Sequence, residues 1–232
     1  MKKVLLKLSG EALATGSGEL YDVSFVDQVA TALKKCSDEG YGLAVVVGAG
    51  NIWRGRQGGE MDRTSADRMG MLATVINAIC LKEAIVRAGG KAEVMSAVAM
   101  APFALTYTAE GAKALMEAGT VVVLGAGLGI PFLSTDTTGA VRAAEVGADV
   151  MLMAKNVDYI YTADPRIDPN AKKLESVKAS EVLAMNLKAI DATATAFCLS
   201  TGMPIGVFGL KDPEDIVRAV KGELVGTVVT PE

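Results

Sequence analysis

The chain has 232 residues, of which 50% are hydrophobic and 22% charged, a composition that excludes intrinsic disorder and supports a buried core. Its 23 lysines and arginines against 27 acidic residues give a net charge of −4, which argues against nucleic acid or an anionic membrane as a partner. The absence of histidine excludes Ser-His-Asp and Cys-His catalysis and His-ligated metal sites.

Short apolar, β-branched runs alternate along the chain with segments of helical spacing. Continuous apolar runs are typical of strands covered on both faces, as in a parallel sheet. In chain order the predicted elements are strand Lys3–Leu8, helix Phe25–Cys36 with Ser24 as N-cap, strand Leu43–Val47, helix Ser65–Ala88, strand Lys91–Met95, helix Ala109–Ala118, strand Val121–Leu124, helix Thr137–Val146, strand Val150–Met153, helices Ser180–Met185 and Thr193–Leu199, strand Ile205–Phe208, helix Glu214–Val220 and strand Thr227–Val229.

This alternation predicts an α/β fold of three layers, αβα, with a mainly parallel central sheet. No internal repeat or Pro/Ser-rich linker interrupts the chain, so residues 1–232 are expected to form one domain. The stretch Tyr159–Ser176 breaks the alternation with two Asp-Pro pairs, and it is expected to be a surface excursion that shapes a ligand site.

Three cysteines, Cys36, Cys80 and Cys198, are far apart and form no C-x-x-C pair. This usage indicates reduced thiols in a cytoplasmic protein. The apolar run after Met1 is ended by Lys7 and is too short for a signal peptide. No uninterrupted apolar stretch reaches the ~20 residues that span a bilayer.

Small residues and cations follow the predicted strands where ligands gather in open parallel sheets, at the carboxyl ends. Glycines allow backbone N–H groups to approach an anion, and helix N-termini favour negative charge. The segments are Lys7–Gly10 after the first strand, Gly48–Asn51 with Arg54 after the second, Gly125–Pro131 and Ser134–Thr138 after the fourth, and Lys155–Asn156 after the fifth. Together they predict a site for several phosphates, although each element alone is a weak signal.

The chemistry that fits this edge is phosphoryl transfer. The Walker pattern G-x-x-x-x-G-K-[ST] does not occur in the sequence. The pattern G-x-G-x-x-G is also absent, because Ile130 stands where a third glycine would follow Gly125 and Gly127. An ionised phosphate attacks without a general base, so positioning and cations suffice in a chain without histidine. Asp136 is expected to hold lysines or organise Mg²⁺; the structural alternative is an N-cap for its helix. Asp67 either accepts ribose hydroxyls or is a first-turn helix acid.

The chain resembles the amino-acid-kinase family and, within it, the bacterial UMP (uridylate) kinases. The similarity extends over essentially the whole chain. The matching stretches are KLSGEAL at Lys7–Leu13, VVVGAGNIWRG at Val45–Gly55, ADRMGMLATVIN at Ala66–Asn77, PFLSTDTT at Pro131–Thr138, VDYIYTADPR at Val157–Arg166 and GELVGTVV at Gly222–Val229.

The resemblance implies transfer of the γ-phosphoryl of ATP to UMP, giving UDP and ADP for pyrimidine nucleotide biosynthesis. Catalysis would involve Lys7, Asp136 and Arg54. The implied ATP-binding residues are Lys7, Leu8, Ser9, Gly10, Gly50, Arg54, Lys155, Asn156, Tyr161 and Asp164. The implied UMP-binding residues are Ala49, Asp67, Leu128, Gly129, Ile130, Pro131, Phe132, Leu133, Ser134 and Thr135.

The same resemblance implies that Mg²⁺ arrives with ATP and that no separate protein-built metal site exists. It also implies a homohexamer built from dimers, with the helix that carries Met69–Ile79 buried at a contact between subunits. The alternative for that apolar stripe is an ordinary core-facing helix.

The sequence departs from the family pattern at Ala49, Leu128, Ile130 and Tyr159, and residues 15–20 lack the usual effector pattern. Two other functions therefore stay open. One is a family member that phosphorylates a carboxylate or carbamate, against which ADRMGMLAT and the short chain argue. The other is a non-catalytic nucleotide-binding or storage protein, against which Lys7, Arg54 and Asp136 argue.

Overall fold

A computed structural model describes residues 1–14, 19–53 and 59–232 of the chain. The predicted catalytic and ATP-binding residue Arg54 lies outside the described residues. All seven predicted strands are confirmed, with ends shifted by no more than two residues.

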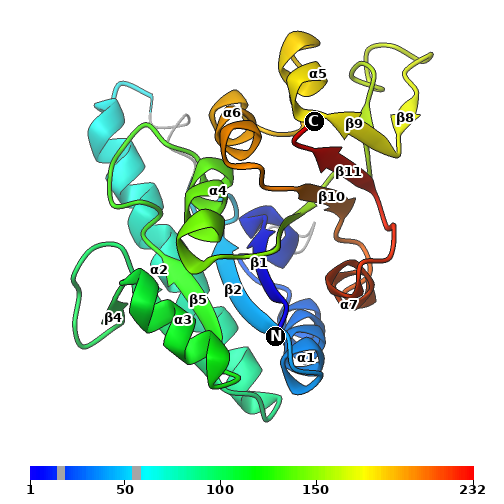
Figure 1. The fold of residues 1–232 in the computed structure, drawn as a ribbon. Coiled ribbons are helices and arrows are strands. Elements are labelled where there is room, and N and C mark those ends of the chain that lie inside the picture. Colours follow the sequence, from blue (N-terminus) through cyan, green and yellow to red (C-terminus); the bar gives the residue numbers. More distant parts are fainter. Residues whose placement is uncertain (15–18, 54–58) are drawn as a thin grey trace.

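The centre of the molecule is a nine-stranded sheet (Figure 1) in the order β4-β3-β5-β2-β1-β6-β10-β11-β9. Neighbouring strands are parallel except for the β10–β11 pair, which is antiparallel. The expected mainly parallel α/β fold is therefore correct. The strands are β1 (Lys3–Leu8), β2 (Gly42–Val47), β3 (Ala92–Ser96), β4 (Leu105–Thr106), β5 (Val121–Gly125), β6 (Val150–Lys155), β9 (Ser176–Lys178), β10 (Ile205–Gly209) and β11 (Thr227–Thr230).

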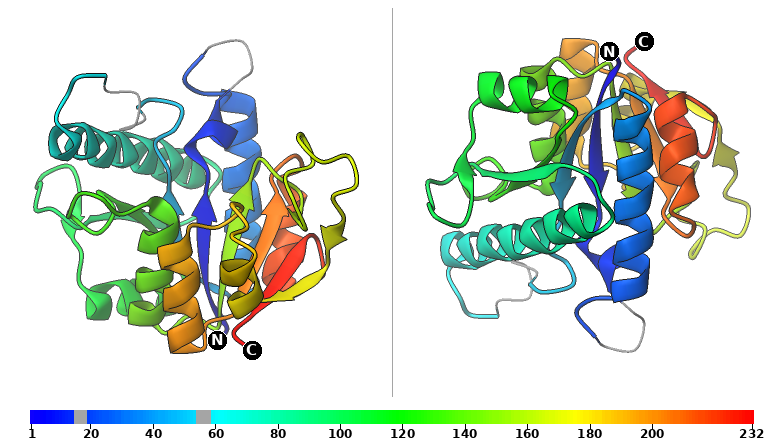
Figure 2. Two further views of the ribbon diagram at one scale, coloured as in Figure 1. Left: turned by 90° about the horizontal axis from the view of Figure 1, so that it is seen from above. Right: turned by 90° about the horizontal axis from the view of Figure 1, so that it is seen from below.

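Helices cover both faces of the sheet, which gives three layers (Figures 1 and 2). One layer holds α1 (Val23–Asp38), α2 (Arg63–Arg87) and α7 (Glu214–Lys221), and the other α3 (Ala109–Glu117), α4 (Thr135–Val146), α5 (Ala179–Ala184) and α6 (Ala192–Thr201). Alternate side chains of one strand enter different cores: Leu6 packs on the α1 side, and Leu5 on the α4 side. Lys7 has the same parity as Leu5, so its side chain emerges toward α4.

At two helices the N-cap differs from the residue that the sequence suggested. Asp22, not Ser24, caps α1, because its carboxylate accepts the backbone N–H of Phe25 at 2.9 Å. In α4 the cap is Ser134, whose Oγ accepts the N–H groups of Asp136 and Thr137 at 3.1 Å each. Asp136 therefore stands in the first turn and is not the N-cap.

The apolar stripe predicted on α2 does not face the core. Val75 is buried, but Met69, Leu72, Ile76 and Ile79 are 40–57% exposed. The buried face of the helix is mostly apolar, with four alanines and two polar residues: Ala66, Ala73, Thr74, Val75, Asn77, Ala78, Leu81, Ala84 and Ile85. The interpretation of the stripe as core-facing is therefore wrong.

The expected excursion between β6 and β9 contains a short antiparallel hairpin, β7 (Ile160–Tyr161) with β8 (Lys173–Leu174). Its base is fixed to the sheet, because the Ile160 N–H donates to Thr227 Oγ1 at 2.8 Å. The short 3-10 helix η1 (Gly10–Leu13) follows β1 at the same sheet edge as Lys155.

Candidate active site

Two lysines from neighbouring strands share one buried carboxylate at the carboxyl edge of the sheet. Lys7 Nζ lies 3.0 Å from Asp136 Oδ1, and Lys155 Nζ lies 2.6 Å from Asp136 Oδ2. Lys7 and Asp136 are only 7% and 8% exposed. Buried ions of this kind are stable only when they are paired. The cluster carries one net positive charge, which suits an anionic ligand.

The electrostatics keep the carboxylate ionised. Burial alone raises the pKa of Asp136, but the ammonium groups of Lys7 and Lys155 outweigh it and hold that pKa below its ordinary value. Burial lowers the pKa of Lys155, and the attraction of Asp136 opposes this effect. With both carboxylate oxygens bound to lysines, Asp136 organises cations and is not free as a proton acceptor.

The start of α4 fixes the position of Asp136. Ser134 caps the helix, and its hydroxyl donates to Asp191, which caps α6 through the N–H of Ala194 at 2.9 Å. The hydroxyl of Thr137 donates to the same carboxylate at 3.0 Å. The Asp191 side chain therefore links the N-termini of α4 and α6 next to the lysine cluster.

The loops after β1 and β2 approach each other closely beside this cluster. A Cβ at Gly10 would lie 2.4 Å from the carbonyl oxygen of Gly48, so no larger residue fits there without a backbone shift. Asn77, fully buried on α2, donates to the Gly48 carbonyl at 2.7 Å and to Asn51 Oδ1 at 2.8 Å. The small residues predicted after these two strands are thus brought together.

A cavity of about 180 Å³ lies between α2 and the loop after β5. Six of the ten predicted UMP-binding residues line it: Ala49, Asp67, Leu128, Ile130, Leu133 and Thr135. The other four, Gly129, Pro131, Phe132 and Ser134, are not among its lining residues. We call this space the acceptor cavity. Its lining also includes Trp53, Gly70, Met71, Thr74, Gly127 and Thr138.

Asp67 has partners on both sides of the acceptor cavity. Its two carboxylate oxygens share the single N–H of Arg63 Nε, at 2.9 and 3.0 Å, and Oδ2 also accepts the backbone N–H of Phe132 at 2.8 Å. The Arg63 guanidinium also lies 5.7 Å from the centre of the Phe132 ring. Asp67 is therefore more than a first-turn helix acid, since it joins α2 to the loop that precedes α4.

The predicted ATP-side residues divide into two groups. The first group lies at or just after the carboxyl ends of three adjacent strands, β1, β2 and β6: Lys7, Leu8, Ser9, Gly10, Gly50, Lys155 and Asn156. Asn156 Nδ2 donates to Glu11 at 2.8 Å across the β1–β6 edge. Tyr161 and Asp164 lie in the excursion instead, where they bind Asp158 and Arg166. The exposed Arg166 guanidinium lowers the pKa of Asp164 to about 2.

Sequence reasoning missed four residues that shape the site: Asp191, Thr74, Asn77 and Trp53. Trp53 Nε1 donates to the Ala66 carbonyl at 2.9 Å, which fixes the ring at the acceptor cavity. Thr74 and Asn77 lie in the family-matching stretch Ala66–Asn77. Polar residues among the apolar residues of a helix could have indicated that these two side chains bind neighbouring loops. For Asp191 the sequence could have indicated only its role as the N-cap of α6, because its bonds to Ser134 and Thr137 join residues 57 and 54 positions apart.

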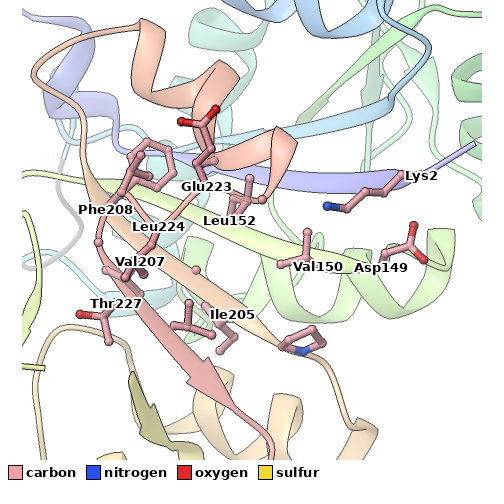
Figure 3. Close-up of a pocket in the computed structure, with 17 residues that line it drawn as sticks. Lys2, Asp149, Val150, Leu152, Ile205, Val207, Phe208, Glu223, Leu224 and Thr227 are labelled. Atoms are coloured by element: carbon pink, nitrogen blue, oxygen red, sulfur yellow. The ribbon is translucent and has the colours of Figure 1, made fainter. Parts of the chain in front are cut away.

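A second cavity, of about 240 Å³, is unrelated to this chemistry (Figure 3). Val150 and Ile205 line it at the amino ends of β6 and β10, whereas Lys155 stands at the carboxyl end of β6. Its floor is mostly apolar, and Lys2 at its rim already donates to the Val220 carbonyl at 3.3 Å. We therefore place the candidate site at the opposite edge of the sheet.

Within residues 1–14, 19–53 and 59–232, no group of three or more His, Cys, Asp or Glu side chains is arranged to hold a metal ion. The carboxylate nearest the lysines has both oxygens occupied by ammonium groups. These residues do not form a protein cage for a divalent cation.

Comparison with known proteins agrees with the geometry of the site. The model of the family described as "Amino acid kinase family" matches residues 2–209. The chain is similar to the solved UMP kinase of Bacillus anthracis, with 31% identity, a TM-score of 0.95, and coverage of 100% of this chain and 96% of that one. It is also similar to the UMP kinase of Ureaplasma parvum, with 35% identity, a TM-score of 0.93 and coverage of 99% and 98%. The uridylate kinase of Archaeoglobus fulgidus aligns with 28% identity, a TM-score of 0.77 and coverage of 99% and 100%.

Proposed function

This chain belongs to the amino acid kinase family, and we propose that it is a UMP kinase, which transfers the γ-phosphoryl group of ATP to UMP and releases UDP and ADP. Full-length similarity to UMP kinases at 28–35% identity supports the proposal. The observation that carries it in the structure is the Lys7–Asp136–Lys155 cluster beside the acceptor cavity.

In the proposed reaction a phosphate oxygen of UMP attacks the γ-phosphorus, and the bond from that phosphorus to the β-phosphate oxygen breaks. The attacking oxygen carries no proton at neutral pH, so the chain needs no histidine or other general base. Lys7 and Lys155 stabilise the charge that spreads over the transferred group, and Asp136 holds both ammonium groups in position. Arg54, outside the described residues, is proposed as a further cation.

We assign the ATP side to the loops after β1, β2 and β6 and the UMP side to the acceptor cavity. Asp67 would accept the ribose hydroxyls, with Thr135 and backbone groups of the Leu128–Leu133 loop facing the base. Tyr161 and Asp164 would reach the adenine side from the excursion. Mg²⁺ is proposed to arrive as part of the ATP complex, with phosphate oxygens and water as its ligands.

We further propose that the protein is a homohexamer, built from dimers, in the cytoplasm. The exposed apolar stripe Met69–Ile79 supports a contact between copies of the chain, because one copy leaves it open to water. The cysteine thiols are free, with Cys36 and Cys198 buried, as in a reducing compartment.

The test is a coupled assay of ADP release with UMP, dUMP, CMP and a set of amino-acid carboxylates as acceptors. We expect transfer to UMP with the highest kcat/KM, since backbone donors in the loop survive the changes to Leu128 and Ile130. Equal kcat/KM for UMP and CMP would show that apolar contact alone reads the base. Turnover with a carboxylate alone would replace the proposal with the second enzyme class, and ATP binding without any turnover would indicate a storage protein.

A further inference from the structure

A buried arginine on α4 is not explained by the phosphate chemistry. Arg142 is 6% exposed and stands six residues after Asp136, on the same helix. A guanidinium ion cannot be deprotonated at physiological pH, so its burial is tolerated only where partners satisfy its charge and its donors.

Arg142 has partners on three sides. Its Nη1 lies 2.6 Å from Glu145 Oε2, which also accepts the hydroxyl of Tyr107 at 2.8 Å. The guanidinium carbon lies 3.7 Å from the centre of the Tyr107 ring, a cation–π contact. Glu145 and Tyr107 thus fix the plane of the guanidinium from two directions.

The third partner belongs to the acceptor cavity. Arg142 Nη2 donates to the carbonyl oxygen of Gly127 at 3.3 Å, and Gly127 lines that cavity. On the other side of the same turn, the Ala126 N–H donates to Thr74 Oγ1 at 2.8 Å. The loop after β5 is therefore bound at successive residues by α2 and by α4.

The backbone between these two bonds is in an unfavourable conformation. Ala126 and Gly127 have φ values of 62° and 59°, in the left-handed region that an alanine rarely adopts. Such a conformation persists only when its surroundings impose it. Without the bond to Gly127, the loop is free to relax away from the shape that forms the cavity wall.

We propose that Arg142, held by Glu145 and Tyr107, is a positioning residue for the acceptor nucleotide. It acts through the Gly127 carbonyl and keeps the Gly125–Leu128 turn in its binding shape before UMP arrives. The inference rests on the proposed function, because it names UMP as the occupant of the acceptor cavity. It assigns Arg142 no contact with the reacting phosphates.

The experiment compares steady-state kinetics of the unmodified protein and Arg142→Met, with UMP and ATP varied separately. Losing a hydrogen bond from a charged donor is expected to raise KM for UMP by about 10-fold to 100-fold. KM for ATP and kcat at saturating UMP should stay close to those of the unmodified protein. A merely structural role would lower the active fraction and leave both KM values unchanged.

Arg218→Met is the matched control. Arg218 on α7 also pairs with an acid three residues away, Asp215, but its side chain is 46% exposed and remote from the acceptor cavity. We expect its KM for UMP to be unchanged. If Arg142→Met does not fold, the same kinetics are measured on Arg142→Lys. This variant keeps a positive charge beside Glu145 but lacks the planar guanidinium that donates to Gly127.

The outcomes separate the two claims. If the unmodified protein does not phosphorylate UMP, the proposed function fails. If it does, and both Arg142 variants that fold keep the KM for UMP of the unmodified protein, the positioning role alone is refuted. A rise in KM for UMP in either variant, with KM for ATP unchanged, supports it.

Discussion

Lys7 and Lys155 reach the same carboxylate from adjacent parallel strands, and this arrangement decides what each charge can do. Asp136 neutralises one of the two ammonium groups and leaves the other for an anion. Because the cluster is largely excluded from water, its remaining charge acts in a medium that screens it weakly. A single charge here therefore has a larger effect on a bound phosphate than a surface lysine has.

We predict that Lys7→Ala lowers kcat by about 10²- to 10³-fold, the usual cost of losing one donor to a developing charge. The fold should persist, since Asp136 keeps its ion pair with Lys155. Lys3→Ala is the control, because Lys3 stands on the same strand but pairs with the exposed Glu117 at 3.0 Å. Equal turnover of the two variants in the ADP-release assay would contradict the assignment of Lys7.

At Asp67 we predict that Asp67→Asn raises KM for UMP more than KM for ATP. A neutral amide accepts hydrogen bonds less strongly than a carboxylate, both from the ribose hydroxyls and from the Phe132 N–H that shapes the cavity. Glu83→Gln is the control, since Glu83 also faces an arginine four residues away on α2, at 4.0 Å. Equal increases in both Michaelis constants would show that Asp67 only stabilises α2 and does not bind UMP.

Among the elements, the first turn of α4 both stabilises the helix and carries Asp136, a candidate catalytic residue. Ser134 ends the loop beside the acceptor cavity and caps the helix on which Asp136 stands. Helix α4 packs mainly on α6 and β1 through Ala140, Ala143 and Val146, so its axis is fixed by the core. The cap then sets where the helix begins, and therefore where Asp136 meets the lysines.

We predict that Ser134→Ala and Thr108→Ala each lower the free energy of unfolding by about 1 kcal/mol, the typical cost of a lost N-cap. Thr108 caps α3 by accepting the Gly111 N–H at 3.0 Å, and no catalytic candidate stands on that helix. Only Ser134→Ala should also lower kcat. Denaturant unfolding and the kinase assay measure the two effects, and equal kcat in both variants would show that the cap has no part in catalysis.

At the scale of the whole molecule, α2 has two apolar faces. One packs on the sheet, and the other exposes Met69, Leu72, Ile76, Ile79 and Val86, each at least 40% accessible. Among the described residues, α2 is also the one helix long and apolar enough to cross a membrane, yet 44% of that span is buried in the protein. The exposed stripe is what a contact between copies of the chain would cover.

We predict that the double variant Leu72→Glu, Ile76→Glu has a smaller native mass than the unmodified protein, because it dissociates the proposed oligomer. Two carboxylates buried in an apolar contact would each need to be desolvated without a partner. Ile167→Glu is the control, since Ile167 is 82% exposed but lies in the excursion, away from α2. Light scattering after size-exclusion chromatography gives the mass of each, and an unchanged mass for the double variant would refute the α2 contact.

The sequence by itself determined the chain order of seven helices and of seven strands, because uninterrupted apolar runs have few stable solutions other than a sheet covered on both faces. It did not predict the short strands β4, β7, β8 and β9. The sequence also indicated which segments meet at the phosphate edge, since the carboxyl ends of parallel strands lie together. The sequence predicted that Asp136 holds lysines or organises Mg²⁺, with an N-cap as the alternative, but the pairing of Asp136 with both Lys7 and Lys155 was seen only in the structure.

Only the tertiary structure decided which side chains contact each other across the chain. Spacing within α2 could not say which of its apolar faces is buried, because both have helical periodicity and only the packing of neighbouring elements distinguishes them. The same holds for the long-range hydrogen bonds of Asp191, Asn77 and Arg142, which join residues 15 to 57 positions apart. Their roles depend on distances that a linear pattern does not contain, because each polar group finds its partner only when the fold brings two segments together.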